Sequence, residues 1–267
     1  MQCAGRSGKR LAGRGDSGYN RLGSGLLRNR GAVHGTPAER HHVQVFIREE
    51  RLRMDIDWFG HSCFRLREAG ITIITDPYDK SIGYTMPRVR ADIITISHDA
   101  AGHAYASAVK GEPKVLTRPG EYEVGGVFVT GIQTWRGASA NGVAREENTV
   151  FVFEFGGLTA CHLGDLSKVL TQPQVEAMPD IHVLFVPVGG GSALDADGAA
   201  EMISLLEPSI VIPMHYHTPY ATIPLDPLSK FLKEMGVPEQ APQDSLRVIR
   251  GQFPQETQVV ILDCKQA

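Results

Sequence analysis

The stretch that decides the fold is "ADIITISHDAAGH", residues 91–103. Its first half, "ADIITI", is a run of apolar and β-branched residues, which is typical of a buried strand. Directly after this strand stand His98 and His103, five positions apart, and the small residues of 104–109 then predict a helix. Because α/β folds place their chemistry at strand ends, the segment predicts a strand followed by a functional loop.

Further short strands surround this segment on both sides. Strands are predicted within 54–60, 63–68, 71–76, 114–135, 148–165, 181–188, 209–214 and 257–263, and many are separated by turns that contain glycine. Helices are predicted over 165–178, 194–208 and 225–236. Runs of strands with helices added later indicate two packed sheets with helices outside them. We therefore expect an α/β fold, a four-layer αββα sandwich.

Length and composition exclude several classes of protein. A chain of 267 residues, 42% hydrophobic, is long enough to bury a large core. Its apolar runs are too short to cross a bilayer, and no secretory signal is evident, so we expect a cytoplasmic protein without a membrane partner. The four cysteines have no paired spacing, which argues against a disulfide framework and a cysteine zinc knuckle.

The charge distribution suggests a boundary before Met54. Residues 1–53 are rich in Gly and Arg and hold 11 basic against 4 acidic residues, whereas residues 54–267 hold 16 against 26. This composition predicts disorder in 1–53. The segment is either a basic tail or transit peptide, or a misassigned start, since Met54 directly precedes the first predicted strand. The acidic body makes nucleic acid an unexpected partner.

Four side chains at strand ends are candidate metal ligands: His98, His103, Asp165 and His215. Imidazole and carboxylate groups are usual ligands of zinc, manganese and iron. Each residue alone is better explained as a satisfied histidine or a helix N-cap. All four follow strong β-runs, which argues against coincidence, although their spacing alone does not prove that they converge. A site built from them would bind a divalent metal, with zinc preferred over manganese and iron.

The chain resembles the metallo-β-lactamase fold superfamily, and in particular its lactonase-like branch of small bacterial metal-dependent hydrolases. The resemblance rests on "DWFGHSCFRL", "TDP", "ITISHDAAGH", "CHLGDL" and "IVIPMHY", which occur in this order. It implies an αββα domain over 54–267. It also implies that His98 and His103 are the first and last positions of an H-x-H-x-D-H motif, Asp165 the bridging Asp and His215 the late His.

This motif is degenerate here. Ala100 stands at its second His, Gly102 at its Asp, and the intermediate His of the family is replaced near Arg136. The resemblance then implies that one of the two metal positions loses its ligands, whereas His103, Asp165 and His215 still hold one ion. The expected site is mononuclear, with His98 as a further ligand or a base.

Other polar residues near these motifs are candidates for proton transfer or substrate binding. His61 and Asp99 are candidate bases, whereas His217 and Arg136 are candidates for contact with an anionic substrate group. The alternatives are a hydrogen-bonded turn histidine for His61, a helix N-cap for Asp99 and a loop residue beside the site for His217. Three glycines at 189–191 could present backbone N–H groups to a phosphate or form a tight loop.

These residues are compatible with two functions. The first is a metal-dependent hydrolase that acts on an ester, a lactone or a phosphoester through a mononuclear site. The second is a non-catalytic relative that binds an anionic metabolite or a protein partner in the altered cleft. Bound metal in stoichiometric amount distinguishes them. A homodimer is the default expectation for the assembly.

Overall fold

The computed structural model describes residues 53–137 and 146–267, so the predicted tail 1–53 lies outside the described residues except for Arg53. Two sheets form, with strand orders β12-β1-β2-β3-β4-β5 and β13-β11-β10-β9-β8-β7-β6. The strands of the first are β1 (Arg53–Gly60), β2 (Cys63–Glu68), β3 (Ile71–Thr75), β4 (Ile93–Thr95), β5 (Lys114–Leu116) and β12 (Leu246–Ile249). Those of the second are β6 (Gly120–Val124), β7 (Val127–Arg136), β8 (Glu146–Phe155), β9 (Leu158–His162), β10 (Val183–Pro187), β11 (Ile210–Met214) and β13 (Gln258–Val259).

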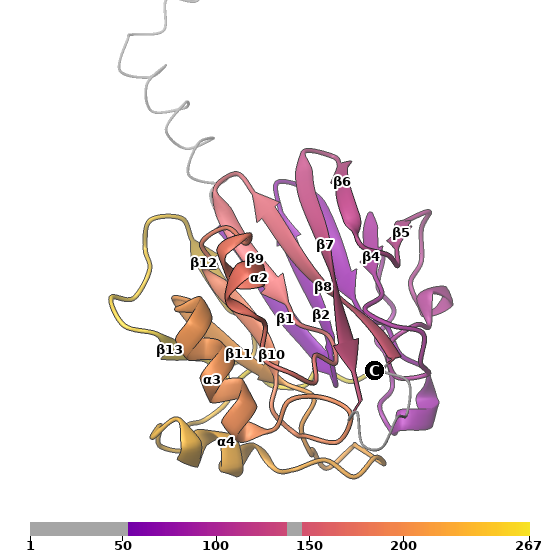
Figure 1. Ribbon diagram of the computed structural model, residues 1–267. Coiled ribbons are helices and arrows are strands. Elements are labelled where there is room, and N and C mark those ends of the chain that lie inside the picture. The colour runs from indigo at the N-terminus through magenta and orange to yellow at the C-terminus, as the bar shows by residue number, and fades with distance from the viewer. Residues whose placement is uncertain (1–52, 138–145) are drawn as a thin grey trace, which may run out of the picture.

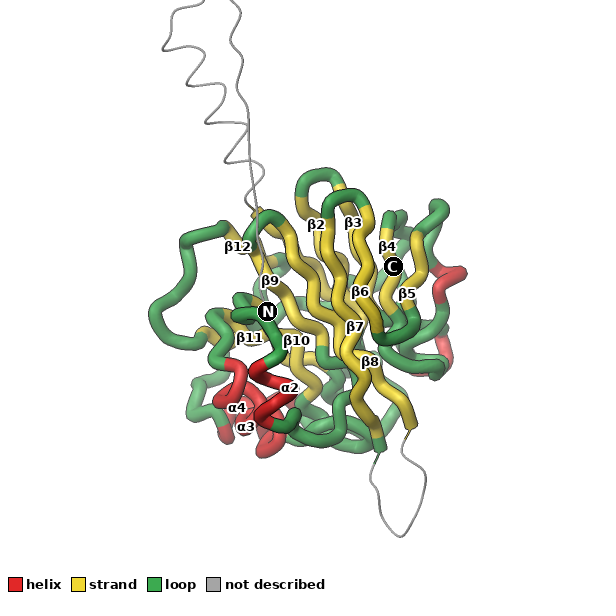
Figure 2. The backbone as a smooth tube through the Cα atoms, turned by 45° about the horizontal axis from the view of Figure 1, so that its top comes forward, coloured by secondary structure: helices red, strands yellow, loops and turns green. Residues whose placement is uncertain are grey.

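Each sheet is antiparallel in one part and parallel in the other. The hairpins β1–β2–β3 and β6–β7–β8–β9 are antiparallel, and Figure 2 shows β6, β7 and β8 side by side. The pairs β3–β4, β4–β5, β9–β10, β10–β11 and β11–β13 are parallel. Parallel strands end at one edge of their sheet, so the loops that follow them are brought together there.

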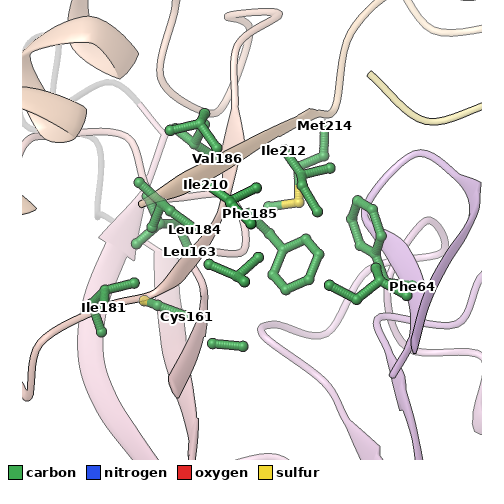
Figure 3. Close-up of a cluster of buried hydrophobic side chains, with 14 of the residues drawn as sticks. Phe64, Cys161, Leu163, Ile181, Leu184, Phe185, Val186, Ile210, Ile212 and Met214 are labelled. Carbon is green, nitrogen blue, oxygen red and sulfur yellow. The ribbon is translucent and has the colours of Figure 1, made fainter. Parts of the chain in front are cut away.

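The main core lies between the two sheets. Phe64 from β2 meets Phe185 from β10, with ring centroids 4.4 Å apart, and both side chains are fully buried (Figure 3). Ile212 and Met214 of β11 lie next to this pair in the same view. Full burial of one such side chain stabilises the fold by roughly 1.5–3 kcal/mol.

Alternation along the strands separates this core from a second one on the outer face of the six-stranded sheet. Ile73 and Ile93 belong to the inter-sheet cluster, whereas their neighbours Ile74 and Ile94 belong to the outer cluster. Successive side chains of a strand point to opposite faces, which explains the division. The connections on either side of β4, residues 76–92 and 96–113, cover the outer face, and they contain one 3₁₀ turn each, η1 (Lys80–Ile82) and η2 (Ala106–Ala108).

Three helices accompany the seven-stranded sheet and lie together on one side of the sandwich in Figure 1: α2 (Gln172–Glu176), α3 (Ala196–Leu206) and α4 (Leu228–Glu234). The N-cap of α3 is Asp195, which accepts a hydrogen bond from the Gly198 amide at 3.0 Å, and Ala199 and Met202 are buried. The αββα sandwich is therefore confirmed. No helix of the described residues is long and apolar enough to cross a membrane.

Two helix predictions were wrong in extent. The expected helix over 104–109 is only the turn η2, none of whose residues is buried, so its small side chains provide no apolar face for a longer helix. The helix expected from Asp165 begins at Gln172 instead. Asp165 does not cap it, because its carboxylate faces the functional site described next.

Candidate metal centre

Five loops bring six titratable side chains together at one end of the sandwich. Asp76 follows β3, His98 and His103 follow β4, Asp165 follows β9, His215 follows β11, and His61 lies in the turn between β1 and β2. All six side chains are buried. The predicted ligands His98, His103, Asp165 and His215 therefore do converge.

Asp165 divides this cluster into two halves. Its Oδ1 atom lies 3.3 Å from His215 Nε2 and 3.5 Å from His103 Nε2, and has no hydrogen-bond partner among the described residues. Its Oδ2 atom accepts a hydrogen bond from Ser192 Oγ at 2.8 Å and lies 3.4 Å from Arg136 Nη2 and 3.7 Å from His98 Nε2. One oxygen thus faces histidines alone, while the other is engaged by a hydroxyl and a guanidinium.

His103 is oriented by a second carboxylate. Its Nδ1 atom lies 2.8 Å from Asp76 Oδ2, within hydrogen-bond distance. Asp76 also accepts hydrogen bonds from the Ser97 amide at 2.7 Å and from Ser97 Oγ at 2.6 Å. A carboxylate on one ring nitrogen fixes the tautomer and turns the other nitrogen towards a metal. His103 Nε2 is the nitrogen that faces Asp165 and His61.

Backbone strain is concentrated at this cluster. Of the five non-glycine residues with positive φ in the described part of the chain, three belong to it: His61 at 51°, Asp76 at 38° and His215 at 52°. Such conformations cost on the order of 1–3 kcal/mol each and persist where the surroundings impose them. The amide of His215 donates to the carbonyl of His61 at 3.2 Å, which joins two of the strained residues.

Burial keeps most of the histidines neutral. It lowers the pKa of His61 well below its ordinary value, lowers that of His215, and lowers the pKa of His98 to about 3. His103 differs. Burial alone would lower its pKa, but the carboxylates of Asp165 and Asp76 raise it. Neutral imidazole is the form that binds a metal, so burial prepares three of these rings for ligation.

Asn148 and Gly164 hold Asp165 in place. Asn148 Oδ1 accepts a hydrogen bond from the Asp165 amide at 2.9 Å, and its Nδ2 donates to the Leu163 carbonyl at 3.0 Å. Gly164 has a φ of +57°, and a Cβ atom there would lie 2.5 Å from both Asn148 Oδ1 and Ser97 Cβ. Only glycine permits this approach, so the "LGD" turn is fixed by geometry.

The ligand atoms of three histidines lie close enough to share a single divalent ion. The ligand atoms of His61, His103 and His215 all lie within 4.8 Å of one another. Two ligand atoms of a tetrahedral zinc ion, each about 2.0–2.1 Å from it, lie about 3.3 Å apart. The separations from Asp165 Oδ1 to His215 and His103 match this spacing. A second group, Asp76, His98 and His103, fits less well because both Asp76 oxygens already accept hydrogen bonds.

Arg136 contacts the Asp165 oxygen that the His103 and His215 rings do not face. Its guanidinium pairs with Glu146 through Nη1 and with Asp165 through Nη2. Arg136 ends β7 and Glu146 begins β8, and the two residues are paired across these strands. The sequence placed Arg136 at the site, and the structure brings it there, in contact with the bridging carboxylate.

Asp99 and His217 are not brought into the cluster. Asp99 is exposed and lines, with His98, a cavity of about 660 Å³ whose wall also includes Arg118. His217 is exposed as well and lines a different hollow, beside Tyr216. Asp99 does not cap a helix, because the chain forms turns up to residue 103.

Sequence reasoning missed Asp76, Asn148 and Ser192. Asp76 is the acidic residue of "TDP", at the end of a predicted strand, which was a usable signal. Ser192 follows the three glycines 189–191, whose backbone N–H groups were the predicted feature of this loop. Asn148 lies in the interior of a strand pattern and nothing in the sequence distinguishes it.

Comparison with known proteins agrees with this fold. Residues 55–215 match the family described as the β-lactamase superfamily domain. The chain belongs to this family, as its sequence motifs indicated.

Individual relatives support the same assignment. A Thermotoga maritima protein, described provisionally as a Zn-dependent hydrolase of the metallo-β-lactamase superfamily, is 41% identical with a TM-score of 0.64, over 78% of this chain and 98% of that one. A protein of Carboxydothermus hydrogenoformans named as a metal-dependent hydrolase is 27% identical over 62% of this chain and 85% of its own length. A metallo hydrolase of Ignicoccus hospitalis, 19% identical with a TM-score of 0.56 over 73% of this chain and 98% of its own, shares the fold.

Proposed function

We propose that the protein is a metal-dependent hydrolase that binds one divalent ion, with zinc preferred, and cleaves an ester, a lactone or a phosphoester. The observation that carries the proposal is Asp165 Oδ1. This buried carboxylate oxygen faces His103 and His215 and has no hydrogen-bond partner within residues 53–137 and 146–267. A buried anionic oxygen without a partner is costly, and a cation at that position removes the cost.

In this proposal, different residues of the site bind the ion, orient its ligands and transfer protons. When bound, the ion supplies Lewis-acid polarisation of a carbonyl or phosphoryl oxygen and activation of water. His103, His215 and Asp165 hold it, and Asp76 orients His103. His98 is neutral, and its Nε2 atom is buried without a hydrogen-bond partner among the described residues. Because this nitrogen lies 3.7 Å from Asp165 Oδ2, it is placed to exchange a proton or a hydrogen bond with a reacting group.

A single ion is favoured over two. A second ion would need Asp165 Oδ2, but this atom already accepts a hydrogen bond from Ser192 and pairs with Arg136. Ala100 offers no ligand where the family has its second His. The guanidinium of Arg136 is permanently charged, so it repels a cation from this half of the cluster.

The cavity beside His98 favours an uncharged ester or lactone over a phosphoester. Apart from Glu146, which pairs with Arg136, its described wall carries the carboxylates of Asp99 and Glu147 against the single guanidinium of Arg118. Carboxylates at the entrance repel a phosphate dianion but not a neutral carbonyl compound. His98 lies in this wall and in the metal cluster, so it connects the cavity to the proposed ion.

The second candidate function is binding without catalysis. It is supported by Arg136, because a guanidinium beside the bridging Asp is a ready site for the anionic group of a metabolite. In that case the cluster needs no metal.

Elemental analysis of the full chain decides between the two. We expect about one equivalent of zinc, manganese or iron per chain, and its loss in His215→Ala. A panel of esters, lactones and phosphoesters then identifies the substrate class. Folded protein that contains no metal after growth in metal-replete medium would overturn the hydrolase proposal and favour the binding function.

A further inference from the structure

We infer that His61 supplies the metal ligand that the degenerate motif has lost at Gly102, so that the ion is held by three histidines and Asp165. The inference rests on the proposed function and specifies the ligand set of the same site. The sequence had suggested His61 only as a base or a turn histidine.

The first support is the space around Gly102. A Cβ atom at Gly102 would lie 3.1 Å from His61 Nε2 and 3.2 Å from His61 Cδ2. The imidazole of His61 therefore lies where a side chain at position 102 would begin, and a carboxylate at 102 could not fit beside it unless the ring moved. We therefore interpret the two positions together: the ligand lost at Gly102 is replaced by His61 in the β1–β2 turn.

The second support is the direction of the His61 ring. Its Nε2 atom lies 3.0 Å from His103 Nε2, and its centroid lies 4.3 Å from that of His215. His103 Nε2 is the atom left for a metal, because Asp76 engages its Nδ1. His61 Nε2 thus points at the same position as the other two rings.

The third support is that His61 is not a satisfied core histidine. Its Nδ1 atom is buried and has no hydrogen-bond partner in the described ranges. A structural histidine at full burial normally uses both nitrogens. The only ring partner of His61 among the described residues is His103 Nε2, which lies 3.0 Å from its Nε2 atom at the proposed metal position. The His61 carbonyl accepts hydrogen bonds from Trp58 Nε1 at 3.1 Å and from the His215 amide.

The exchange has a chemical consequence. It replaces an anionic carboxylate by a neutral imidazole, which leaves Asp165 as the only anionic ligand in the set. The centre is therefore more positively charged by one unit than a site that has the motif Asp. These four protein donors would hold the ion, and a fifth position would remain for water, a coordination number that zinc can reach.

The test measures metal binding directly in the full chain. The variants are His61→Ala, Gly102→Asp and the double variant, and the control is His217→Ala, an exposed histidine outside the cluster. The readouts are the Zn²⁺ dissociation constant by chelator competition, metal content, and the visible absorption of the Co²⁺-substituted protein. Circular dichroism establishes that each variant is folded.

We expect His61→Ala to weaken Zn²⁺ binding about 100-fold and to change the Co²⁺ spectrum, while His217→Ala binds as the wild type does. Gly102→Asp alone should also weaken binding, because its side chain collides with His61. The double variant should bind Zn²⁺ more tightly than His61→Ala does. Its Co²⁺ spectrum should correspond to one nitrogen ligand fewer than that of the wild type.

Wild-type affinity and an unchanged Co²⁺ spectrum in His61→Ala would overturn the inference while leaving the proposed function intact. Failure of the folded double variant to bind better than His61→Ala would overturn the exchange with Gly102. Absence of metal from the wild type would instead refute the proposed function itself, so the two failures are distinguishable.

Discussion

The guanidinium of Arg136 lies 3.4 Å from Asp165 Oδ2, while the other oxygen of the same carboxylate faces His103 and His215. A fixed cation and the proposed metal position thus share one carboxylate. Because the two positive charges would compete for it, we expect Arg136 to lower the affinity of the site for metal and to disfavour a second ion.

Removal of the guanidinium should therefore tighten metal binding. In Arg136→Gln, we expect the Zn²⁺ dissociation constant to fall about three- to tenfold, because a positive charge near the ion is lost. Chelator competition measures it, and Arg118→Gln, a change in the cavity wall, is the control. Weaker binding in Arg136→Gln than in the wild type would show that the guanidinium supports the site instead of opposing the ion.

Asp76 should control metal affinity without touching the metal. Its hydrogen bond to His103 Nδ1 fixes the ring, and loss of such a partner typically costs 10–100-fold in metal affinity, so we expect a loss of about this size in Asp76→Asn. The matched control is Asp79→Asn, which removes an exposed carboxylate that caps η1. Equal affinities of the two variants would contradict the orienting role.

The ion pairs of Asp57 make the free energy of unfolding depend on pH in the acid range. Burial alone would raise its pKa, but hydrogen bonds from Lys265 and Arg65 outweigh this and hold the pKa below its ordinary value. The unfolded carboxyl therefore binds a proton more readily than the folded one. The stabilisation is fully present above the unfolded pKa of about 3.9 and is lost as the pH falls through the folded value.

We therefore expect Asp57→Asn to be less stable than the wild type by about 2 kcal/mol at neutral pH, with the difference shrinking towards pH 2. Urea denaturation at several pH values measures it, and Glu121→Gln, an exposed carboxylate of β6, is the control. A difference that grows as the pH falls would refute the assignment.

Truncation of a ring in the Phe64–Phe185 contact should cause a large loss of folding stability. Both rings are fully buried between the sheets, so Phe185→Ala should lower the free energy of unfolding by about 3–5 kcal/mol. Phe128→Ala removes the same atoms from a ring that is 54% exposed, and should cost under about 0.5 kcal/mol. The two variants are compared by denaturant titration, and similar losses would contradict the placement of the core.

The sequence predicted the sandwich from local patterns, and together with the family resemblance it predicted that four candidate ligands approach one another. Apolar runs mark buried strands, and the ends of parallel strands meet wherever the sheet forms. His98, His103, Asp165 and His215 follow such runs, which argued against coincidence, and the family resemblance then implied that they approach one another. The αββα architecture followed from the same strands and from the family resemblance.

Other features depend on contacts that no local pattern encodes. That the ring of His61 fills the space beside Gly102 involves two turns 41 residues apart, and it was visible only in three dimensions. The start of α2 was misplaced because Asp165 resembles an N-cap in the sequence, whereas its carboxylate is engaged by Ser192. Where a residue such as Asp165 suits two roles, its contacts in the folded structure decide which role it has.

The pairing of β1 with β12 has a consequence for folding during translation. Arg53 pairs with Ile249 and Lys265 reaches back to Asp57, so the first described strand has its outer edge covered only by residues near the end of the chain. During translation, this edge is exposed until those residues are made. Exposed edges invite pairing with other chains. Nascent chains of this protein should therefore depend on protection by chaperones until residues 246–265 have been synthesised.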